Sequence, residues 1–413
     1  MAYRAFRAEP VRGAAANLAL AAGSLAFAVA ATELTLQALH YPPTDSGFQN
    51  LLVRYDSLRG WRNIPGAVGE FTTEGHRVRL VYNSRGFRGP ERPYAKPPGT
   101  YRIVLLGDSF LDGYSVPLEE RLPELLERDL AARSQAIEAI ALRTPGYSTD
   151  QELLWLEEEG LRYQPDLVVL LFYANDVWYN DRATYWPRAK PRFVLAGDTL
   201  VLTNVPVPRP EPADTMGRRP GFVGRMRERS RFVRLAVRAI KYHPTLFAWA
   251  IRHQLASVPP EMVLESGNYE PLPEEFMVFR NPLPAAAAAA WRVTDAIVAR
   301  MQRDVQSHEA QLLVLYVPFI ASVYPPGDRT RRQYGLQARG FDPEAVAHRF
   351  ATMCERQHLH CIEPTARFRA AADSLSSRGM RLYYRHDWHW NGNGHRLAGR
   401  LIKEYLDANA RER

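Results

Sequence analysis

The sequence predicts an α/β fold in which a parallel sheet lies between two layers of helices. Short apolar runs with strand character alternate along the chain with longer segments whose apolar residues recur at helical spacing. The clearest run covers residues 166–172, where six apolar residues follow Pro165 and Asp166. Because a strand that is apolar on both faces must be covered on both, this alternation indicates a three-layer α/β/α sandwich.

Five short apolar runs are expected to form the strands of the sheet. They cover residues 103–106, 137–142, 166–172, 311–317 and 360–362. Helical spacing predicts helices over residues 118–133, 149–161, 284–308 and 343–358, and a final helix from about Gly394. Gly107 closes the first run and Thr144-Pro145-Gly146 closes the second, so both strands are expected to run into sharp turns.

The chain is long enough, at 413 residues, for one large domain with insertions or for two ordinary ones. The alternation of strands and helices stops after Trp178 and resumes near Pro284, so we expect an interrupted fold. The expected segments are a signal anchor or transmembrane helix (1–40), an N-terminal extension (41–100), the first part of the core (101–177), an insertion (178–283) and the second part of the core (284–413).

Two segments outside the core have features of their own. The extension is rich in Pro, Gly and Arg and looks like an ordered cap or a set of short strands. Its apolar anchors are Phe48, Leu51, Leu52, Trp61, Phe71, Val78, Leu80 and Tyr82. In the insertion, residues 191–207 alternate around Gly197-Asp198 like a hairpin. Residues 225–255 have the spacing of one or two basic amphipathic helices, which lie on a membrane or, more often, pack on their own domain.

The N-terminus has the pattern of a membrane-targeting segment. Arg4, Arg7 and Arg12 precede residues 13–32, which contain no charged residue. A helix of that length spans about 30 Å, the thickness of the hydrocarbon core. Basic residues before the span favour a cytoplasmic N-terminus and an extracytoplasmic body, periplasmic or at the cell surface. We expect a retained anchor; a signal peptide cleaved after Ala28-Val29-Ala30, which would make the body secreted, and a buried Ala-rich helix are the alternatives.

The distribution of charge argues against a nucleic-acid partner, and the cysteine content limits the possible disulfides to one. The net charge is +8, but the 53 Lys and Arg are spread along the chain, so we expect no nucleic-acid partner and prefer a basic surface beside an anionic membrane. Cys354 and Cys361 are too few for a disulfide framework. They flank an apparent helix-to-strand turn and either pair with each other or remain two partly buried thiols.

Three residues far apart in the sequence could together form a nucleophilic site. Ser109 follows the first predicted strand, and Asp387 precedes His389 by two positions in Asp387-Trp388-His389-Trp390-Asn391. A serine hydroxyl needs a base within hydrogen-bond reach, and the base needs a partner that fixes its tautomer. In an extended chain Asp387 could reach one ring nitrogen of His389 and leave the other for Ser109, which indicates a serine hydrolase.

An oxyanion site is expected beside that serine. Ser109, Gly146 and Asn175 each follow the end of a predicted strand, and in open parallel sheets sites form beyond the carboxyl ends of the strands. Gly146 has no side chain to obstruct its backbone N–H, and Asn175 carries an amide donor. The N–H groups of Ser109 and Gly146 and the Asn175 amide are therefore expected to stabilise a tetrahedral oxyanion.

Four blocks of sequence, in order, resemble those of the SGNH (GDSL-like) hydrolase superfamily over residues 101–177 and 284–408. The blocks are Gly107-Asp108-Ser109-Phe110 with Gly113, Pro145-Gly146-Tyr147-Ser148, Ala174-Asn175-Asp176, and Asp387 to Asn391 with Gly394-His395. The resemblance implies a five-stranded, flavodoxin-like parallel sheet. It also implies Ser109 as nucleophile, Gly146 and Asn175 in the oxyanion hole, and Asp387 and His389 as acid and base.

The chain departs from the superfamily's pattern at two places. The third block has Tyr173-Ala174 where many members have a glycine, and the last block has Asp-x-His in place of the commoner Asp-x-x-His. The compact form followed by Trp resembles bacterial, membrane-anchored SGNH proteins that acetylate or deacetylate polysaccharides.

Several neighbouring residues compete for roles in this site. His386 and His395 are weaker candidates for the base than His389, because one precedes the acid and the other lies where the last helix begins. Asp108 and Asp176 are expected to stabilise turns. Trp388 and Trp390 either wall a sugar site or pack in the core. No metal or cofactor is expected, since the sequence has no His-Glu-x-x-His motif, no paired-cysteine spacing of the kind that binds zinc and no dinucleotide fingerprint.

The sequence thus predicts a membrane-anchored, extracytoplasmic serine esterase that cleaves or transfers acyl groups, expected to be O-acetyl groups, on carbohydrate or other envelope esters. Its substrate would be a small-molecule or glycan ester. A lipid-directed esterase or lysophospholipase, with the insertion as an apolar lid, is one alternative. A non-catalytic glycan-binding SGNH module is the other.

Overall fold

The computed structural model describes residues 9–39, 41, 51–131, 135–185, 188–210, 225–226, 229–241, 246, 249, 253, 274–324, 340–385 and 387–410. The chain divides into two compact units, each built from segments that are distant in sequence. One unit consists of Met1–Thr44 and Gly217–Ala256, and the other of Asp45–Met216 and Ser257–Arg413. The larger unit holds the sheet, and the smaller unit holds the N-terminal helix.

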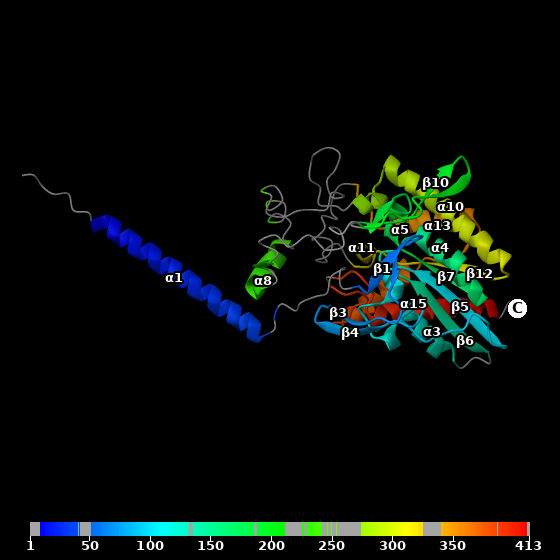
Figure 1. The fold of residues 1–413 in the computed structure, drawn as a ribbon, viewed down its shortest axis with the longest axis horizontal. Coiled ribbons are helices and arrows are strands. Elements are labelled where there is room, and N and C mark those ends of the chain that lie inside the picture. The colour runs from blue at the N-terminus through cyan, green and yellow to red at the C-terminus, as the bar shows by residue number, and fades with distance from the viewer. Residues whose placement is uncertain are drawn as a thin grey trace, which may run out of the picture. The chain divides into compact units, whose positions relative to one another are not determined.

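A parallel five-stranded sheet forms the centre of the larger unit (Figure 1), as predicted. Its strands lie in the order β13-β12-β7-β5-β6, and every neighbouring pair is parallel. The bounds are β5 Thr100–Gly107, β6 Ala136–Arg143, β7 Leu167–Phe172, β12 Gln311–Tyr316 and β13 His360–Ile362. Because β6, β5 and β7 are neighbours, the loops after these three strands leave the sheet side by side.

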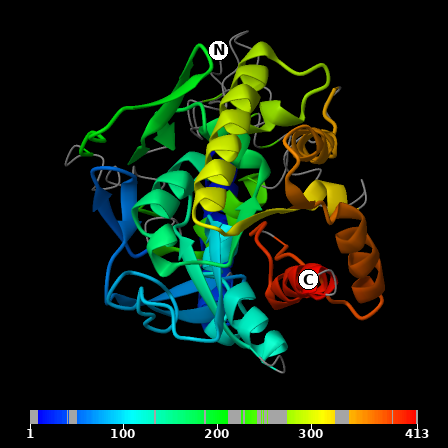
Figure 2. The same cartoon turned by 90° about the vertical axis from the view of Figure 1, so that its right-hand side faces the viewer.

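Helices cover both faces of the sheet, which completes the predicted sandwich (Figure 2). The ring of Phe172 at the end of β7 lies 6.1 Å from Trp291 and 5.5 Å from Phe350, centroid to centroid, so their helices pack on one face. The helices of this face are α4 Thr149–Glu158, α10 Ala285–Ser307 and α13 Ala345–Arg356. Those of the opposite face are α3 Leu122–Leu130, α14 Thr365–Ser376 and α15 Gly392–Ala410.

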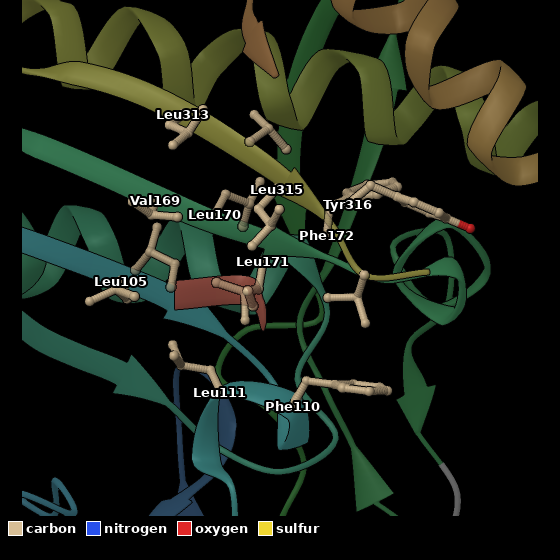
Figure 3. Close-up of a cluster of buried hydrophobic side chains, with 14 of the residues drawn as sticks. Leu105, Phe110, Leu111, Val169, Leu170, Leu171, Phe172, Leu313, Leu315 and Tyr316 are labelled. Atoms are coloured by element: carbon tan, nitrogen blue, oxygen red, sulfur yellow. The ribbon is translucent and has the colours of Figure 1, made fainter. Parts of the chain in front are cut away.

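The core is continuous across the middle strands. Val169 of β7 pairs with Leu105 of β5 on one side and with Leu313 of β12 on the other, and all three side chains are fully buried (Figure 3). Burying a side chain of this size contributes about 1.5–3 kcal/mol. This layer of apolar side chains anchors the strand ends from which the site residues project.

One predicted helix is split in two. In place of a helix over residues 118–133, a short 3-10 helix η2 covers Leu118–Glu120, and α3 begins at Leu122. Arg121 between them is extended, with φ −79° and ψ 156°. Pro123 in the first turn of α3 lacks a backbone N–H, so it suits the start of a helix and not its interior.

The N-terminal extension contains two antiparallel hairpins. They are β1 Val53–Asp56 with β2 Gly60–Asn63, and β3 Val68–Thr73 with β4 His76–Val81. The expected anchors Trp61, Phe71 and Leu80 are buried, and Phe71 and Leu80 form a small apolar cluster with Tyr114. Phe48, another expected anchor, lies outside the described residues.

Segments between residues 178 and 283 belong to both units. The larger unit contains β8 Thr184–Tyr185, β9 Arg188–Ala189, β10 Arg192–Ala196, β11 Thr199–Thr203 and the 3-10 helix η5 Glu274–Phe279. Strands β10 and β11 form an antiparallel hairpin that turns at Gly197 and Asp198. Residues 217–256 belong to the smaller unit, in which α8 covers Arg231–Lys241.

The smaller unit begins with the long helix α1, Glu9–Ala38. Within the described residues, its segment Ala16–Ala38 is the one helix long and apolar enough to cross a membrane, with a mean hydropathy of 1.6. The helix continues beyond the predicted apolar stretch and includes Glu33. This carboxylate accepts hydrogen bonds from the start of α8, so α1 and α8 contact each other within the unit (Figure 1).

The two cysteines form a disulfide. Cys354 near the end of α13 is joined to Cys361 in β13, with a Cα–Cα distance of 6.2 Å. The disulfide links the edge strand β13 covalently to the preceding helix α13. Of the two possibilities left open by the sequence, the structure therefore has the paired one.

Candidate active site

Residues from three neighbouring loops and from the C-terminal segment line one pocket of about 190 Å³. Ser109 follows β5, Gly146 follows β6 and Asn175 follows β7, all at the carboxyl edge of the sheet. His389 reaches the same pocket from the segment before α15. The topology therefore brings together four of the residues that the sequence selected, from positions separated by up to 280 residues.

Ser109 lies at a sharp turn from strand to helix. The Asp108 carboxylate accepts a hydrogen bond from the backbone N–H of Phe110 at 2.8 Å and so caps the short helix α2, Ser109–Asp112. A Cβ at Gly107 would lie 2.8 Å from the Leu111 Cβ, so only glycine fits at the end of β5. These two residues fix the turn that carries the serine, and Asp108 has the turn-stabilising place expected of it.

His389 lies between Ser109 and Asp387. Its Nε2 is 2.7 Å from the Ser109 Oγ, and its Nδ1 forms a short hydrogen bond with the Asp387 Oδ1. The backbone N–H of Tyr384 donates to the His389 carbonyl at 3.0 Å, next to an antiparallel bridge between Tyr383 and Trp390. Asp387 and His389 lie at bends and not in a continuous extended segment, yet the Asp387 carboxylate reaches the Nδ1 of His389 as expected from their two-residue spacing.

Asp387 and His389 each stabilise the charged form of the other. Burial disfavours the protonated imidazole, but the Asp387 carboxylate outweighs this effect, and the pKa of His389 lies above its ordinary value. Burial likewise disfavours the ionised carboxylate of Asp387, yet His389 and two further hydrogen bonds bring its pKa below the ordinary value. Asp387 therefore stabilises positive charge on His389, the charge that the imidazole gains when it takes up a proton.

The N-terminal extension contributes to the same site. The Thr73 hydroxyl donates a hydrogen bond to the Asp387 Oδ2 at 3.1 Å, and the Asp387 backbone N–H donates to the Glu74 Oε1 at 3.2 Å. Both residues lie at the tip of the β3–β4 hairpin. Sequence reasoning missed them, because more than 310 residues separate them from Asp387 and no local pattern connects the two segments.

Tyr114 is a further neighbour that sequence reasoning missed. Its hydroxyl lies 3.3 Å from the Nδ1 and 3.4 Å from the Nε2 of His389. Burial and the charge of Asp387 raise the pKa of Tyr114 well above its ordinary value, so the phenol stays protonated. Its position five residues after Ser109, beyond Gly113, is the signal that could have drawn attention to it.

Gly146 and Asn175 line the pocket on the sides of β6 and β7. Gly146 has φ +80°, a conformation that favours glycine, which explains why this turn uses one. Asn175 lies in the first turn of α5, Ala174–Tyr179, which Asp176 caps by accepting a hydrogen bond from the Tyr173 N–H at 2.8 Å. Asp176 therefore has the structural place expected of it, and Asn175 is left facing the pocket.

Buried carboxyl groups lie next to the site. Burial raises the pKa values of Asp108, Asp176 and Glu152, the last two well above their ordinary values. The charge of Asp108 also raises the pKa of Asp176, and the charges of Asp176 and Asp108 raise that of Glu152. Among the described residues, neither carboxylate oxygen of Glu152 has a hydrogen-bond partner. Glu152 on α4 was not singled out from the sequence, because one acidic residue in the first turn of a helix is an ordinary feature.

Aromatic side chains form the pocket walls. Trp388 stacks on Phe276 with a centroid distance of 5.8 Å and an interplanar angle of 17°. Phe276 and Phe279 come from η5 in the insertion, which sequence reasoning did not connect with the site. Trp390, in contrast, is fully buried and packs on Phe368 at 5.5 Å. Of the two tryptophans, one therefore walls the pocket and the other belongs to the core.

The other two histidines of the segment have different situations. His395 lies buried in α15, where burial and the nearby guanidinium groups of Arg121 and Arg88 lower its pKa to about 3. It is therefore neutral, and its ring packs against Trp390 at 5.7 Å. His386 lies outside the described residues.

Comparisons with solved structures find matches at low sequence identity and with TM-scores below 0.5. An acetyl xylan esterase, AlAXEase, is 12% identical with a TM-score of 0.37, and the match covers 74% of this chain and 99% of that one. The lipase/acylhydrolase from Enterococcus faecalis is 14% identical with a TM-score of 0.35, covering 75% and 96%. The psychrotrophic esterase EstA from Pseudoalteromonas sp. is 14% identical with a TM-score of 0.34, covering 74% and 98%. No curated protein matches the chain.

A family match covers both the strands of the sheet and the loops that carry the site residues. The GDSL-like lipase/acylhydrolase family matches residues 105–397, which begin inside β5 and end inside α15. This range is well over half of the chain and contains Ser109, Gly146, Asn175, Asp387 and His389. The chain therefore belongs to the GDSL-like lipase/acylhydrolase family and is a hydrolase of ester bonds.

Proposed function

We propose that the protein is a serine esterase in which Ser109 is the nucleophile, His389 the general base and Asp387 the acid that orients it. One observation carries this proposal: the His389 Nε2 lies 2.7 Å from the Ser109 Oγ while Asp387 holds the Nδ1. This is hydrogen-bond distance for a proton transfer from the hydroxyl to the imidazole. The pocket beside the serine gives an ester room to reach it.

The reaction proceeds in two acyl transfers. In the first, the Ser109 Oγ bonds to the ester carbonyl carbon while its proton moves to the His389 Nε2, and the carbonyl π electrons move onto the oxygen. The N–H groups of Ser109 and Gly146 and the Asn175 amide donate hydrogen bonds to that oxyanion. When it collapses, the alkoxide leaves with the proton from His389, and the acyl group remains on Ser109.

In the second transfer, the acceptor decides the outcome. Water attacks the acyl-serine, gives its proton to His389 and releases a carboxylic acid, which makes the protein an esterase. A sugar hydroxyl that attacks in the same way receives the acyl group, which makes it an O-acyltransferase. Either acceptor regenerates the Ser109 hydroxyl, and the chemistry requires no cofactor.

We propose a short acyl group, acetyl, on a carbohydrate or another ester of the cell envelope. The pocket of about 190 Å³ is smaller than the usual volume of a site for a drug-sized ligand. Trp388, stacked on Phe276, offers a flat aromatic wall of the kind that sugars pack against. The same aromatic walls would suit a lipid acyl chain if the pocket opened, so a lipid-directed esterase is the second candidate.

We also propose that α1 is a retained anchor and that the hydrolase unit is extracytoplasmic. Arg4, Arg7 and Arg12 precede the apolar part of the helix, which by the positive-inside rule leaves the N-terminus in the cytoplasm. The segment Ala16–Ala38 has the length and hydropathy of a span. A disulfide between Cys354 and Cys361 is compatible with an oxidising compartment.

The substrate proposal is tested by comparing p-nitrophenyl acetate with p-nitrophenyl octanoate, using the full-length protein in detergent micelles. We expect kcat/KM for acetate to exceed that for octanoate, and Phe279→Ala, which widens the pocket, to reduce this preference. A preference for octanoate would contradict the acetyl proposal and favour the lipid-directed esterase. Acetate release from an O-acetylated polysaccharide, measured with and without an added glycan acceptor, then separates hydrolysis from transfer.

A further inference from the structure

The smaller unit joins two segments that the sequence keeps almost 200 residues apart. Glu33 of α1 accepts hydrogen bonds from the Ser230 hydroxyl at 2.8 Å, the Arg231 N–H at 3.0 Å and the Phe232 N–H at 2.8 Å. The carboxylate therefore caps the N-terminus of α8, where the helix dipole favours a negative charge. This contact fixes the start of α8 beside the last turns of α1.

The position of that contact along α1 matters. Glu33 lies five residues before Ala38, the end of both the helix and its apolar span. If α1 crosses a bilayer, Glu33 is then at the level where the hydrocarbon core gives way to the headgroups. The start of α8 is held at the same level, because its first N–H groups bind that carboxylate.

The sequence of α8 suits a helix in the plane of such an interface. The segment 225–241 contains seven Lys and Arg and one Glu, a net charge of +6 within 17 residues. In α8 the basic positions 231, 234, 238 and 241 recur at helical spacing, and Phe232, Val233, Ala236 and Ile240 occupy the opposite side. No acidic residue interrupts the basic side. This pattern is typical of helices that place an apolar side in the acyl region and basic residues among anionic headgroups.

Exposed apolar side chains elsewhere in the unit also indicate contact with a membrane surface. Trp249 is 51% exposed, Leu246 46% and Met226 40%. All three lie in 217–256, the segment that the unit adds to α1. Large exposed apolar residues beside a basic helix are costly in water but favourable at a membrane interface, where Trp is enriched.

We propose that α8 (Arg231–Lys241) is a membrane-binding segment and that it lies on the anionic phospholipid surface where α1 leaves the bilayer. The segment gives the protein a second attachment to the membrane besides its anchor, and Glu33 links the two. The proposal rests on the retention of α1 as an anchor and not on the hydrolase chemistry. Part of the insertion thus belongs to the membrane and not to the substrate pocket.

The test places a fluorescent label on α8 in the full-length protein. Because the two native cysteines are joined in a disulfide, a thiol-reactive, polarity-sensitive dye labels only an introduced cysteine. Ala236→Cys puts the dye on the apolar side of α8, Ser24→Cys puts it in α1, and Ser374→Cys puts it on exposed α14 of the hydrolase unit. Each protein is reconstituted into phosphatidylcholine vesicles with or without about 30% phosphatidylglycerol, and quenching by brominated lipid is measured.

We expect the dye at 236 to be quenched by brominated lipid when phosphatidylglycerol is present, and to lose this quenching at high salt. The dye at 24 should be quenched in both vesicles and the dye at 374 in neither. Replacing Arg234, Arg238 and Lys241 by Gln should lower the equilibrium constant for contact at 236 roughly 100-fold, about fivefold for each charge removed. Hydrolysis of p-nitrophenyl acetate by this triple variant should be unchanged, which shows that the hydrolase unit is intact.

Two results would overturn the proposal. If the dye at 236 responds neither to brominated lipid nor to phosphatidylglycerol while the dye at 24 is quenched, α8 does not lie on the membrane. If the dye at 24 is not quenched either, α1 is not inserted and the premise fails with the proposal. Activity against p-nitrophenyl acetate is independent of both outcomes, so neither can be mistaken for a failure of the esterase assignment.

Discussion

The hydroxyl of Ser109 has two acceptors within reach. The His389 Nε2 is at 2.7 Å and the Asp108 Oδ2 is at 3.3 Å. The nearer acceptor is also better suited to take the proton, because Asp108 already accepts the Phe110 N–H and serves the turn. Asp387, in contrast, reaches only the far nitrogen of the imidazole, where it can stabilise positive charge.

The raised pKa of His389 predicts the acidic limb of the pH profile. His389 must be neutral to accept the proton, so kcat/KM should rise with pH through its pKa, which Asp387 holds above the ordinary histidine value. Asp387→Asn removes that carboxylate, so the limb should move to lower pH while kcat falls about 10⁴-fold. The measurement is the pH dependence of p-nitrophenyl acetate hydrolysis by both proteins. An acidic limb at the same pH in the variant would contradict the proposed pairing.

Asn175 should act on the transition state and not on binding. Asn175→Asp keeps the size of the side chain but removes its donor, and we expect kcat to fall about 10²–10³-fold with little change in KM. Steady-state kinetics with p-nitrophenyl acetate provide the measurement. Asn180→Asp serves as a control for the substitution itself, because Asn180 is buried away from the pocket on the Asp150 and Thr294 side of α5. An unchanged kcat in Asn175→Asp would remove this residue from the oxyanion site.

The sequence predicted for some residues, but not for others, that they would lie at the candidate site. Ser109, Gly146, Asn175, Asp387 and His389 stand in short local patterns, and the structure gathers them around one pocket, with Asp387 behind His389. Thr73 and Glu152 stand in no such pattern. Their proximity to the site follows from tertiary packing, which spacing along the chain does not encode.

At the scale of elements, the β3–β4 hairpin contacts Asp387 of the proposed catalytic triad. It brings the Thr73 hydroxyl to the outer oxygen of Asp387, and Thr73 itself is buried. A hydrogen bond to a charged group contributes about 1.5–3 kcal/mol. The hairpin therefore helps to keep Asp387 ionised and in line with His389, although 314 residues separate Thr73 from Asp387.

Removing this hydrogen bond should impair turnover more than binding. Thr73→Val keeps the shape of the side chain but loses the donor, and we expect kcat to fall about tenfold with KM unchanged. Thr73→Ser retains the hydroxyl and should restore most of the activity. The comparison is made with p-nitrophenyl acetate across the pH range. Equal losses in Thr73→Val and Thr73→Ser would indicate a packing role alone.

A buried ion pair joins α2, the short helix that begins at Ser109, to strand β6 of the sheet. Asp112 of α2 and Arg143 of β6 are 2.7 Å apart, and both side chains are fully buried. Asp112→Asn leaves a buried guanidinium without its carboxylate and should lower the free energy of unfolding by about 3–5 kcal/mol. Asp129→Asn, which breaks the exposed pair with Arg128, should change it by no more than about 1 kcal/mol. Urea denaturation in detergent micelles measures both; similar values for the two variants would contradict the assigned role of Asp112.

Elements with a strong apolar pattern were predictable, and those set by tertiary contacts were not. All five strands of the central sheet were expected, since short apolar runs between turn residues, such as 166–172, are typical of buried strands. The break at Arg121 was missed, because the apolar spacing continues through it while Pro123 starts a new helix. The contribution of η5 to the pocket was missed, because its aromatic residues carry no signal of where the insertion folds back.

At the scale of the whole molecule, the chain interleaves two units. Residues 178–283 looked like one insertion, but 217–256 belong with α1 and the flanking parts belong with the sheet. The link between α1 and α8 is made by Glu33, whose partners follow 197 to 199 residues later. Periodicity reveals an amphipathic helix, but it does not reveal which distant element caps it.

The central claim is that Ser109 attacks the ester, and trapping the acyl group on it tests this claim most directly. Full-length protein and its Ser109→Ala variant are given p-nitrophenyl acetate, and nitrophenol release is followed before peptides are examined by mass spectrometry. We predict turnover in the native protein, acetylation of the peptide that contains Ser109, and a loss of activity of roughly 10⁴-fold or more in the variant. A folded Ser109→Ala protein that turns over at the native rate, or an acetyl group on another residue, would contradict the account.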